Sequence, residues 1–402
     1  MPALTDPAAA DVAAQVGAIA PEMIALRQRI HAHPELGFEE HQTSELVASS
    51  LERWGYQVHR GVGRTGVVAT LRCGTSERRL GLRADMDALP ITELTGLPYA
   101  SQRPGLMHAC GHDGHTATLL AAARVLGLTR AFDGTLTLIF QPAEEGLGGA
   151  QAMLDDGLFE RFPCDALYAF HNSPGAPAGM FGFRAGVVYS SSDTAIIKIH
   201  GRGGHGAKPH LAVDPILAAS HLVLALQSIV SREVNPNDLA IVTVGAFHAG
   251  EAPNVIPASA ELRLTIRARS EAVRAQLRDR ITAMAETQAA VHGARAEVDY
   301  RWRYPVTVND AAATAFARDA ALALVGEGGV LPEWPPGLAS DDFGLMLQRV
   351  PGCYFNVGNG VGEGPGEGGC SVHNAGYDFN DRILPSTASF FVHLVQRWFA
   401  RA

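Results

Sequence analysis

The sequence has few cysteines, no long apolar run and no excess of positive charge. Its five cysteines are odd in number and widely spaced, which is typical of reduced thiols in a cytoplasm rather than of a disulfide framework. No stretch reaches the roughly 18 apolar residues of a membrane-spanning helix, and the N-terminus, which carries Asp6 and Asp11, lacks the basic region of a secretory signal. The net charge of −9 argues against nucleic acid as the main partner, so we expect a cytoplasmic protein that binds neither nucleic acid nor a membrane.

Strands and helices alternate over most of the chain, which is typical of an α/β domain with a mostly parallel central sheet. The length of 402 residues favours about two domains, and we assign 1–186 and 302–402 to one discontinuous domain. Its expected strands are 67–71, 80–84, 136–140, 166–170 and 353–357, and its expected helices are 21–33, 42–54, 116–126, 310–325 and 386–399.

The segment 187–301 has a different pattern, in which strands and helices follow the order βαββαβ. This is the order of the split-βαβ, or ferredoxin-like, arrangement. We therefore predict a second domain inserted into the first. Its expected elements are a strand at 195–199, a helix at 215–231, strands at 239–246 and 258–267, a helix at 271–291 and a strand at 294–300.

Acidic and histidine side chains come directly after three of the predicted strands. Asp85 and Asp87 follow the strand at 80–84, Glu144 and Glu145 follow the one at 136–140, and His171 follows the one at 166–170. In open α/β sheets, ligands bind outside the carboxyl ends of the strands. The sequence therefore predicts that these groups meet at one edge of the sheet.

The motif Cys110-Gly111-His112 offers two good ligands for a divalent transition metal such as zinc. A lone pair of this kind is equally well explained by a buried cysteine beside a histidine at a helix start. The surrounding stretch, 107–115, holds three histidines, one aspartate and one cysteine in nine residues. Core packing does not require that composition, and the stretch favours a metal site.

The pair Glu144-Glu145 requires a compensating charge or solvent, because adjacent carboxylates repel each other. An exposed acidic turn is one interpretation. The alternative gives the two side chains separate tasks, one as a metal ligand and the other as a general base for water bound to the metal. Asp85 and Asp87 also have two interpretations. They either form a capping turn or lie behind the metal ligands, where they would orient a histidine or the base.

His171 and His373 each have an ordinary structural explanation when taken alone. Together with Cys110, His112 and Glu145 they make five ligands of mixed type, which is more than a single catalytic zinc requires. Two divalent metal ions that share a water fit this number better. Zinc suits the ligand set, with manganese, cobalt and nickel as alternatives.

Three residues of the predicted inserted domain are candidates for contact with a substrate. His205, in a glycine-rich turn, is either a turn residue or a donor to a developing oxyanion. Asn254, in the loop 253–257, could donate a hydrogen bond to a substrate. Arg267 could pair with a substrate carboxylate, although an ordinary surface arginine at a strand end explains it equally well.

Six motifs together resemble those of co-catalytic metallopeptidases of the aminoacylase, hippurate hydrolase and indole-acetyl-amino-acid hydrolase group. The resemblance spans nearly the whole chain, and it implies a zinc-aminopeptidase-like catalytic domain with an inserted lid through which two copies dimerise. The motifs are RADMDALP (83–90), MHACGHDGHTA (107–117), QPAEEG (141–146), GRGGHGAKPH (201–210), PNVIP (253–257) and HNAGYDFND (373–381).

The resemblance also implies roles for individual residues. Glu144 matches the general base, and Asp87 matches the supporting catalytic aspartate, whereas Asp85 stands where more distant relatives have a histidine ligand. His205 matches the lid histidine that reaches the site of the partner subunit, and Asn254 matches a loop residue near the substrate. The positions that match metal ligands are Cys110, His112, Glu145, His171 and His373.

Three positions depart from the pattern of this group. Ala375 stands where proline is usual after His-Asn, Asp341 replaces a glutamate before Asp-Phe, and Leu264 stands where a glycine often precedes Thr-Ile-Arg. None of these changes removes a ligand or the base. They bear on the shape of the pocket and hence on the choice of substrate.

The function predicted from the sequence is metal-dependent hydrolysis of the amide bond of N-acyl-L-amino acids, which releases a carboxylic acid and a free amino acid. A metallo-exopeptidase that acts on dipeptides would use the same chemistry, and a non-catalytic metal or small-molecule binding protein is a further alternative. An oxidoreductase ranks last because no G-x-G-x-x-G follows the first strand. Benzoyl, acetyl, longer acyl and indole-acetyl groups all remain open as the acyl part.

Overall fold

The computed structural model describes residues 7–364 and 366–400, which form two compact units. The first unit comprises the described chain up to Val188, then Val308–Pro335, and the chain from Leu345 onwards. The second unit comprises Tyr189–Thr307 and Pro336–Gly344. The chain passes from one to the other through β7 (Gly186–Tyr189) and β14 (Thr307–Asn309).

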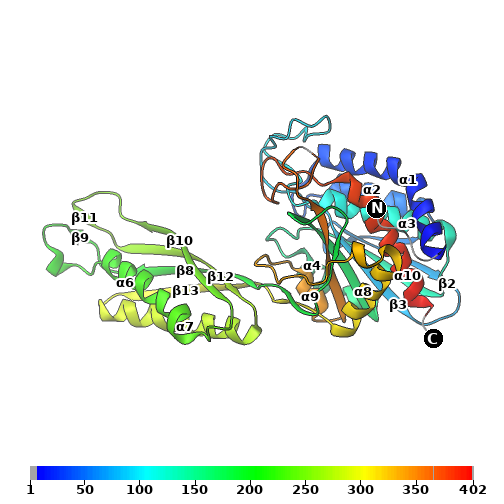
Figure 1. Ribbon diagram of the computed structural model, residues 1–402. Helices are drawn as coiled ribbons and strands as arrows, with labels where there is room; N and C mark the ends of the chain where they lie inside the picture. The colour runs from blue at the N-terminus through cyan, green and yellow to red at the C-terminus, as the bar shows by residue number, and fades with distance from the viewer. Residues whose placement is uncertain (1–6, 365, 401–402) are drawn as a thin grey trace. The chain divides into compact units, whose positions relative to one another are not determined.

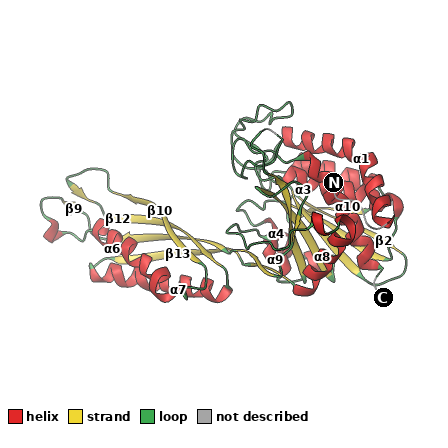
Figure 2. Ribbon diagram, in the orientation of Figure 1, coloured by secondary structure: helices red, strands yellow, loops and turns green. Residues whose placement is uncertain are grey.

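The first unit contains a seven-stranded sheet of mixed direction (Figures 1 and 2). The neighbours β4/β3, β3/β5 and β5/β15 are parallel, whereas β1/β2, β2/β4 and β15/β6 are antiparallel. The predicted mostly parallel sheet is therefore correct only for the four central strands. The tight turn between β1 and β2 makes that pair an antiparallel hairpin. The strands in sheet order are β1 (Gln57–Val62), β2 (Gly66–Cys73), β4 (Gly134–Gln141), β3 (Arg79–Asp85), β5 (Ala166–Pro174), β15 (Gly352–Gly360) and β6 (Phe181–Gly182).

Helices α1, α3 and α10 pack against one another, and α8 packs against α10. The helix α1 begins at Pro7, well before the predicted start at residue 21, and it continues through Pro21. Its alanine-rich first half has a high helix propensity, which a single interior proline does not cancel. The helices are α1 (Pro7–Ala32), α2 (His41–Arg53), α3 (His112–Thr129), α4 (Gly149–Asp155), α5 (Leu158–Arg161), α8 (Ala311–Val325), η3 (Glu327–Gly329), η4 (Asp381–Ile383) and α10 (Leu384–Phe399).

The second unit has the predicted element order, and two helices accompany a four-stranded sheet (Figure 1). The strand order is β10-β12-β8-β13, and all three neighbouring pairs are antiparallel. The alternation along β12, with every second side chain buried, supplies one wall of a separate apolar core. The elements are β8 (Ser192–His200), β9 (Gly204–His205), η1 (Pro209–Leu211), α6 (Pro215–Ser228), η2 (Ile229–Glu233), β10 (Ala240–Ala249), β11 (Val255–Ile256), β12 (Ser259–Ala268), α7 (Glu271–Val291) and β13 (Arg295–Tyr304). The short helix α9 (Phe343–Leu347) begins at the end of the unit's last segment and continues into the first unit.

One helical stretch of the described chain, Pro215–Glu233, is long and apolar enough to cross a membrane by length and composition alone. Its side chains Ala218, Leu222 and Leu226 are fully buried in the core of the second unit, and α6 packs against α7. Of the apolar window, 33% is buried, and the core helix of a folded domain can meet the same criteria of length and composition.

Candidate metal centre

The carboxyl ends of β3, β4 and β5 bring the predicted metal-binding residues of the first unit together. Asp85 is the last residue of β3, and Glu144 and Glu145 follow the end of β4. His171 lies within β5, which continues to Pro174 instead of ending at residue 170 as predicted. His112 is the first residue of α3, so the amino end of that helix faces the same edge.

Cys110, His112 and His171 form one group whose potential ligand atoms lie within 4.8 Å of one another. The Cys110 Sγ is 3.4 Å from His171 Nε2, and His171 Nδ1 donates to the carbonyl of Asn172 at 2.6 Å. This second bond leaves Nε2 directed at the group. Gly111 permits the approach, because a Cβ at that position would lie 2.3 Å from Asn172 Oδ1.

Two further groups overlap with the first. Cys110, Glu145 and His373 form one of them, and His112, Glu144 and Glu145 form the other, with the same 4.8 Å limit. His373 Nε2 lies 3.1 Å from Glu145 Oε1, and the His373 amide donates to the carbonyl of Ala109 at 2.7 Å. This backbone bond ties the late segment around His373 to the 107–115 stretch. All five predicted ligands and Glu144 therefore meet at one place.

Asp87 connects two parts of this centre. Its Oδ1 accepts a hydrogen bond from His112 Nδ1 at 3.1 Å, and its Oδ2 accepts one from the Glu145 amide at 2.9 Å. A carboxylate on Nδ1 fixes the imidazole tautomer and leaves Nε2 for a metal. Asp85 instead binds His115 Nδ1 at 2.6 Å and pairs with Arg83.

The donor set fits divalent metal ions. The His112 Nε2 is buried and makes no hydrogen bond within the described parts of the chain. Burial and the Glu145 charge raise the pKa of the Cys110 thiol. Hydrogen bonds to Cys110 and Glu145 raise the pKa of His373 to about 10. A divalent cation binds thiolate and neutral imidazole, so its binding would release the protons that these two side chains otherwise keep.

The three other predicted site residues lie in the second unit. His205 is exposed on β9, where its Nδ1 accepts the Ala207 amide at 3.1 Å. Asn254 is exposed and precedes β11, and His205 pairs with Val255 across the two short strands. Arg267 is half-buried on β12 and donates to Ser340 Oγ at 2.9 Å. His205 and Asn254 are thus neighbours within this unit, whereas Arg267 belongs to a different sheet of the unit.

A buried ion cluster behind the metal centre has no counterpart in the sequence-based prediction. The fully buried Arg27, on α1, pairs with Asp113 at 3.2 Å, with Asp378 at 2.9 Å and with Asp381 at 2.9 Å. Asp113 directly follows His112, and Asp378 lies shortly after His373, so Arg27 links the two segments that carry these ligands. A lone arginine in a helix gives no sequence signal for such a role, because its partners are distant in the chain.

His31 belongs to the same cluster and makes the stability of the protein depend on pH. Burial lowers its pKa, but the contact of Nδ1 with Asp113 at 2.9 Å, helped by Glu93, raises the pKa to about 9 despite the nearby Arg27. This value exceeds the pKa of about 6.5 that a histidine has in the unfolded chain. The stabilisation that protonated His31 gives the folded chain is therefore fully present below pH 6.5 and is lost as the pH rises through 9. We expect a loss of about 3 kcal/mol in the free energy of unfolding.

The measurement is urea unfolding of the wild type and of His31→Gln between pH 6 and pH 10. The variant should lack most of the decline that the wild type shows. His33→Gln is the matched control, because His33 is half-buried directly after the same helix and its Nδ1 bonds to the Arg29 carbonyl instead of to a carboxylate. An equal decline in wild type and His31→Gln would contradict the assignment.

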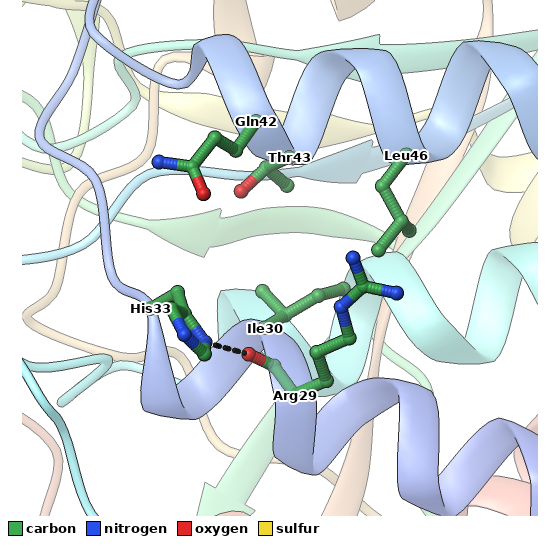
Figure 3. Close-up of a pocket in the computed structure, with 6 residues that line it drawn as sticks. All are labelled: Arg29, Ile30, His33, Gln42, Thr43 and Leu46. Carbon is green, nitrogen blue, oxygen red and sulfur yellow. Dashed lines mark hydrogen bonds between the residues drawn. The ribbon is translucent and has the colours of Figure 1, made fainter.

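A small surface pocket lies apart from the metal centre, between α1 and α2 (Figure 3). Its volume is about 80 Å³, and none of its lining residues is a predicted ligand, base or substrate contact. The nearby α2 amides of Gln42 and Thr43 are already bonded to the Glu35 carboxylate. We therefore assign no function to it. The lining residues are Arg29, Ile30, His33, Gln42, Thr43 and Leu46.

Comparison with known proteins agrees with this geometry. A hippurate hydrolase of Campylobacter jejuni is 43% identical over 93% of this chain and 95% of its own length. An IAA-amino acid hydrolase of Arabidopsis thaliana is 37% identical over 94% of this chain and 86% of its own length. The solved Bacillus subtilis YXEP protein, described as a dinuclear metal binding peptidase from the M20 family, is 31% identical with a TM-score of 0.82, covering 95% of this chain and 99% of that one.

The family model that matches the chain covers most of its length. Its description is peptidase family M20/M25/M40, and the match extends over residues 81–397, which include every candidate ligand and Glu144, the candidate base. The resemblance inferred from the sequence motifs is thereby confirmed. The chain belongs to peptidase family M20/M25/M40.

Proposed function

We propose that this protein is a metal-dependent amidohydrolase that cleaves N-acyl-L-amino acids into a carboxylic acid and a free amino acid. The observation that carries the proposal is the convergence of one thiol, three imidazoles and one carboxylate, in overlapping groups with ligand atoms within 4.8 Å, beside Glu144. Five protein ligands exceed the three of a single catalytic zinc, which favours two divalent ions. The hippurate and IAA-amino acid hydrolases among the relatives act on substrates of this class by name.

The residues of the chain divide the work of hydrolysis between them. Two divalent ions, when bound, would lower the pKa of a water and polarise the acyl carbonyl. Glu144 then takes a proton from the attacking water and passes it to the leaving amine as the C–N bond breaks. Asp87 binds the His112 side chain and the Glu145 amide, and so fixes both relative to the Glu144 carboxylate.

We also propose that 187–301 is a ferredoxin-like lid and dimerisation domain of a cytoplasmic homodimer. The partner subunit's His205 would donate to the developing oxyanion. Asn254 would contact the substrate, and its position next to the His205 strand supports a shared task. Arg267 bonds to Ser340 through one nitrogen, and its remaining N–H donors could pair with a substrate carboxylate.

A substrate panel tests the proposed function. N-benzoyl, N-acetyl, longer N-acyl and indole-acetyl amino acids are compared with dipeptides that share the same C-terminal residue. An acyl pocket without a partner for a free α-ammonium must desolvate that charge, so we expect kcat/KM to be at least about 100-fold higher for the best N-acyl amino acid. Faster cleavage of dipeptides would instead establish an exopeptidase, and binding without turnover would establish a non-catalytic protein.

The identity of the metal is a separate question. We propose zinc, because the site combines thiolate, imidazole and carboxylate ligands. Manganese, cobalt and nickel can occupy the same set. Reconstitution of the metal-free protein with each ion, followed by measurement of bound metal and of kcat, distinguishes them.

A further inference from the structure

A carboxylate from a distant part of the chain holds the loop that carries Glu144 and Glu145. Glu40 lies immediately before α2, is fully buried, and accepts a hydrogen bond of 2.8 Å on Oε1 from the amide of Ala143. We propose that Glu40 is a positioning residue of the hydrolytic site, which sets the place of the Glu144 carboxylate through the backbone of Ala143. The proposal rests on the function proposed above and adds a residue to it.

The helix next to Glu40 does not use this carboxylate. Glu40 occupies the N-cap position of α2, where an acidic side chain commonly accepts the first free amides of the helix. Its side chain makes no such bond. Glu35 does so instead, and accepts the amides of Gln42 at 3.0 Å and Thr43 at 2.9 Å. Local structure therefore does not account for the inward direction of the Glu40 side chain.

The backbone that Glu40 holds is strained. Ala143 has a φ of 52°, in the left-handed region that residues other than glycine rarely adopt. Such a conformation persists only where surrounding contacts impose it. Gly37 supplies a second contact from the same segment, because a Cβ on Gly37 would lie 2.9 Å from the Ala143 Cα. The segment 37–40 thus fixes Ala143 both by packing and by a hydrogen bond.

Two hydrogen bonds hold the loop, one at the amide before Glu144 and one at the amide after it. Glu40 accepts the amide of Ala143, and Asp87 accepts the amide of Glu145 at 2.9 Å. The other oxygen of Glu40 accepts a bond of 2.5 Å from Thr65 Oγ1, which orients the carboxylate. The peptide that carries Glu144 therefore has a fixed anchor on each side. Loss of one anchor lets the base move, and a displacement of about 1 Å can cost roughly 100-fold in rate.

The fold does not gain stability from the charge of Glu40. Burial raises its pKa to about 7, the Thr65 hydrogen bond opposes this, and the Asp87 charge adds to it. A carboxyl with a raised pKa binds its proton more tightly in the folded chain, so its contribution to stability falls as the pH rises from about 4.5 through 7. The buried Glu40 carboxylate does not stabilise the fold near neutral pH, and yet it holds a strained loop. Its presence is therefore better explained by a role in function than by a role in stability.

Four variants test the proposal. Glu40→Gln keeps the length of the side chain and an acceptor for the Ala143 amide, and its amide nitrogen would donate to the Thr65 hydroxyl, which donates to Glu40 in the wild type. Glu40→Asp keeps the charge but is shorter, and Glu40→Leu removes both hydrogen bonds. Glu39→Leu is the matched control, because it makes the same glutamate-to-leucine change at the neighbouring residue, whose side chain is exposed. For each protein we would measure kcat, KM, bound metal and hydrogen exchange of the peptide 142–149.

We expect Glu40→Asp and Glu40→Leu to lower kcat by about 10- to 100-fold, with KM nearly unchanged and faster exchange in 142–149. Glu40→Gln should restore kcat to within a few-fold of the wild type, and Glu39→Leu should match the wild type. Wild-type kcat and exchange in Glu40→Asp would overturn the proposal, even if Glu40→Leu fails to fold. Absence of turnover by the wild type would refute the hydrolase function instead, and the exchange measurement would still test the anchor.

Discussion

Replacement of Glu144 by glutamine is expected to lower kcat by roughly 10²- to 10⁴-fold, because an amide of the same shape cannot take a proton from water. Glu144 is buried, and its carboxylate lies within 4.8 Å of the potential ligand atoms of His112 and Glu145. Since five other side chains complete the proposed ligand set, the variant should bind the same amount of metal as the wild type. The measurement is steady-state kinetics on the best N-acyl amino acid, with the metal content determined on the same sample.

Glu145→Gln is the informative comparison, because the two carboxylates are adjacent and differ only in the proposed task. Glu145 lies 3.1 Å from His373 Nε2 and shares a group with Cys110. We therefore expect Glu145→Gln to lose metal as well as activity. Full activity in Glu144→Gln with normal metal content would end the assignment of the base. Equal loss of metal in both variants would show that Glu144 is a ligand.

Removal of the metal ions is expected to abolish activity to the background level, and a divalent ion should restore it. Cys110→Ser should weaken metal binding by more than the roughly 10- to 100-fold typical when only a residue behind a metal ligand is changed. The reason is that the Cys110 thiol belongs to two of the overlapping ligand groups. Competition with a chromophoric chelator measures the affinity, and a return of kcat on titration with metal measures the recovery.

Cys164→Ser is the matched control for this variant. Cys164 is another free thiol of the first unit, near the beginning of β5, and its Sγ lies 3.0 Å from where a Cβ on Gly81 would stand, early in β3. This is the opposite end of the strands from the metal centre. The control should keep metal affinity and kcat. Activity that survives exhaustive chelation would contradict the metal-dependent mechanism itself.

The metal centre of the first unit could be predicted from the sequence in some detail. Apolar strands that end in Asp85, Glu144 or His171 indicate side chains at the carboxyl edge of a sheet, and the parallel central strands place them there. The composition of 107–115 adds the donors Cys110 and His112. These signals are local, because a strand and the residue after it are adjacent in the chain.

The groups that hold this centre in place could not be predicted in the same way. Arg27, Glu40 and Asp113 act through partners that are far away in sequence, and each taken alone is an ordinary charged residue of a helix or helix end. The left-handed backbone of Ala143 could not be predicted either, since residues other than glycine rarely adopt it and no sequence pattern marks an alanine that does. The mixed direction of the outer strands was missed because periodicity gives no strand direction.

The sequence by itself determined the alternation of strands and helices, the order βαββαβ of the second unit, and the chemical types of the candidate ligands and of the proposed base. Each of these depends on residue type and short-range spacing, which the linear chain records directly. Only the tertiary structure decided which amide each buried carboxylate accepts and how Arg27 joins the segments of His112 and His373. The physical reason is that hydrogen bonds and buried ion pairs depend on distances of about 3 Å, which folding sets between residues that the sequence separates widely.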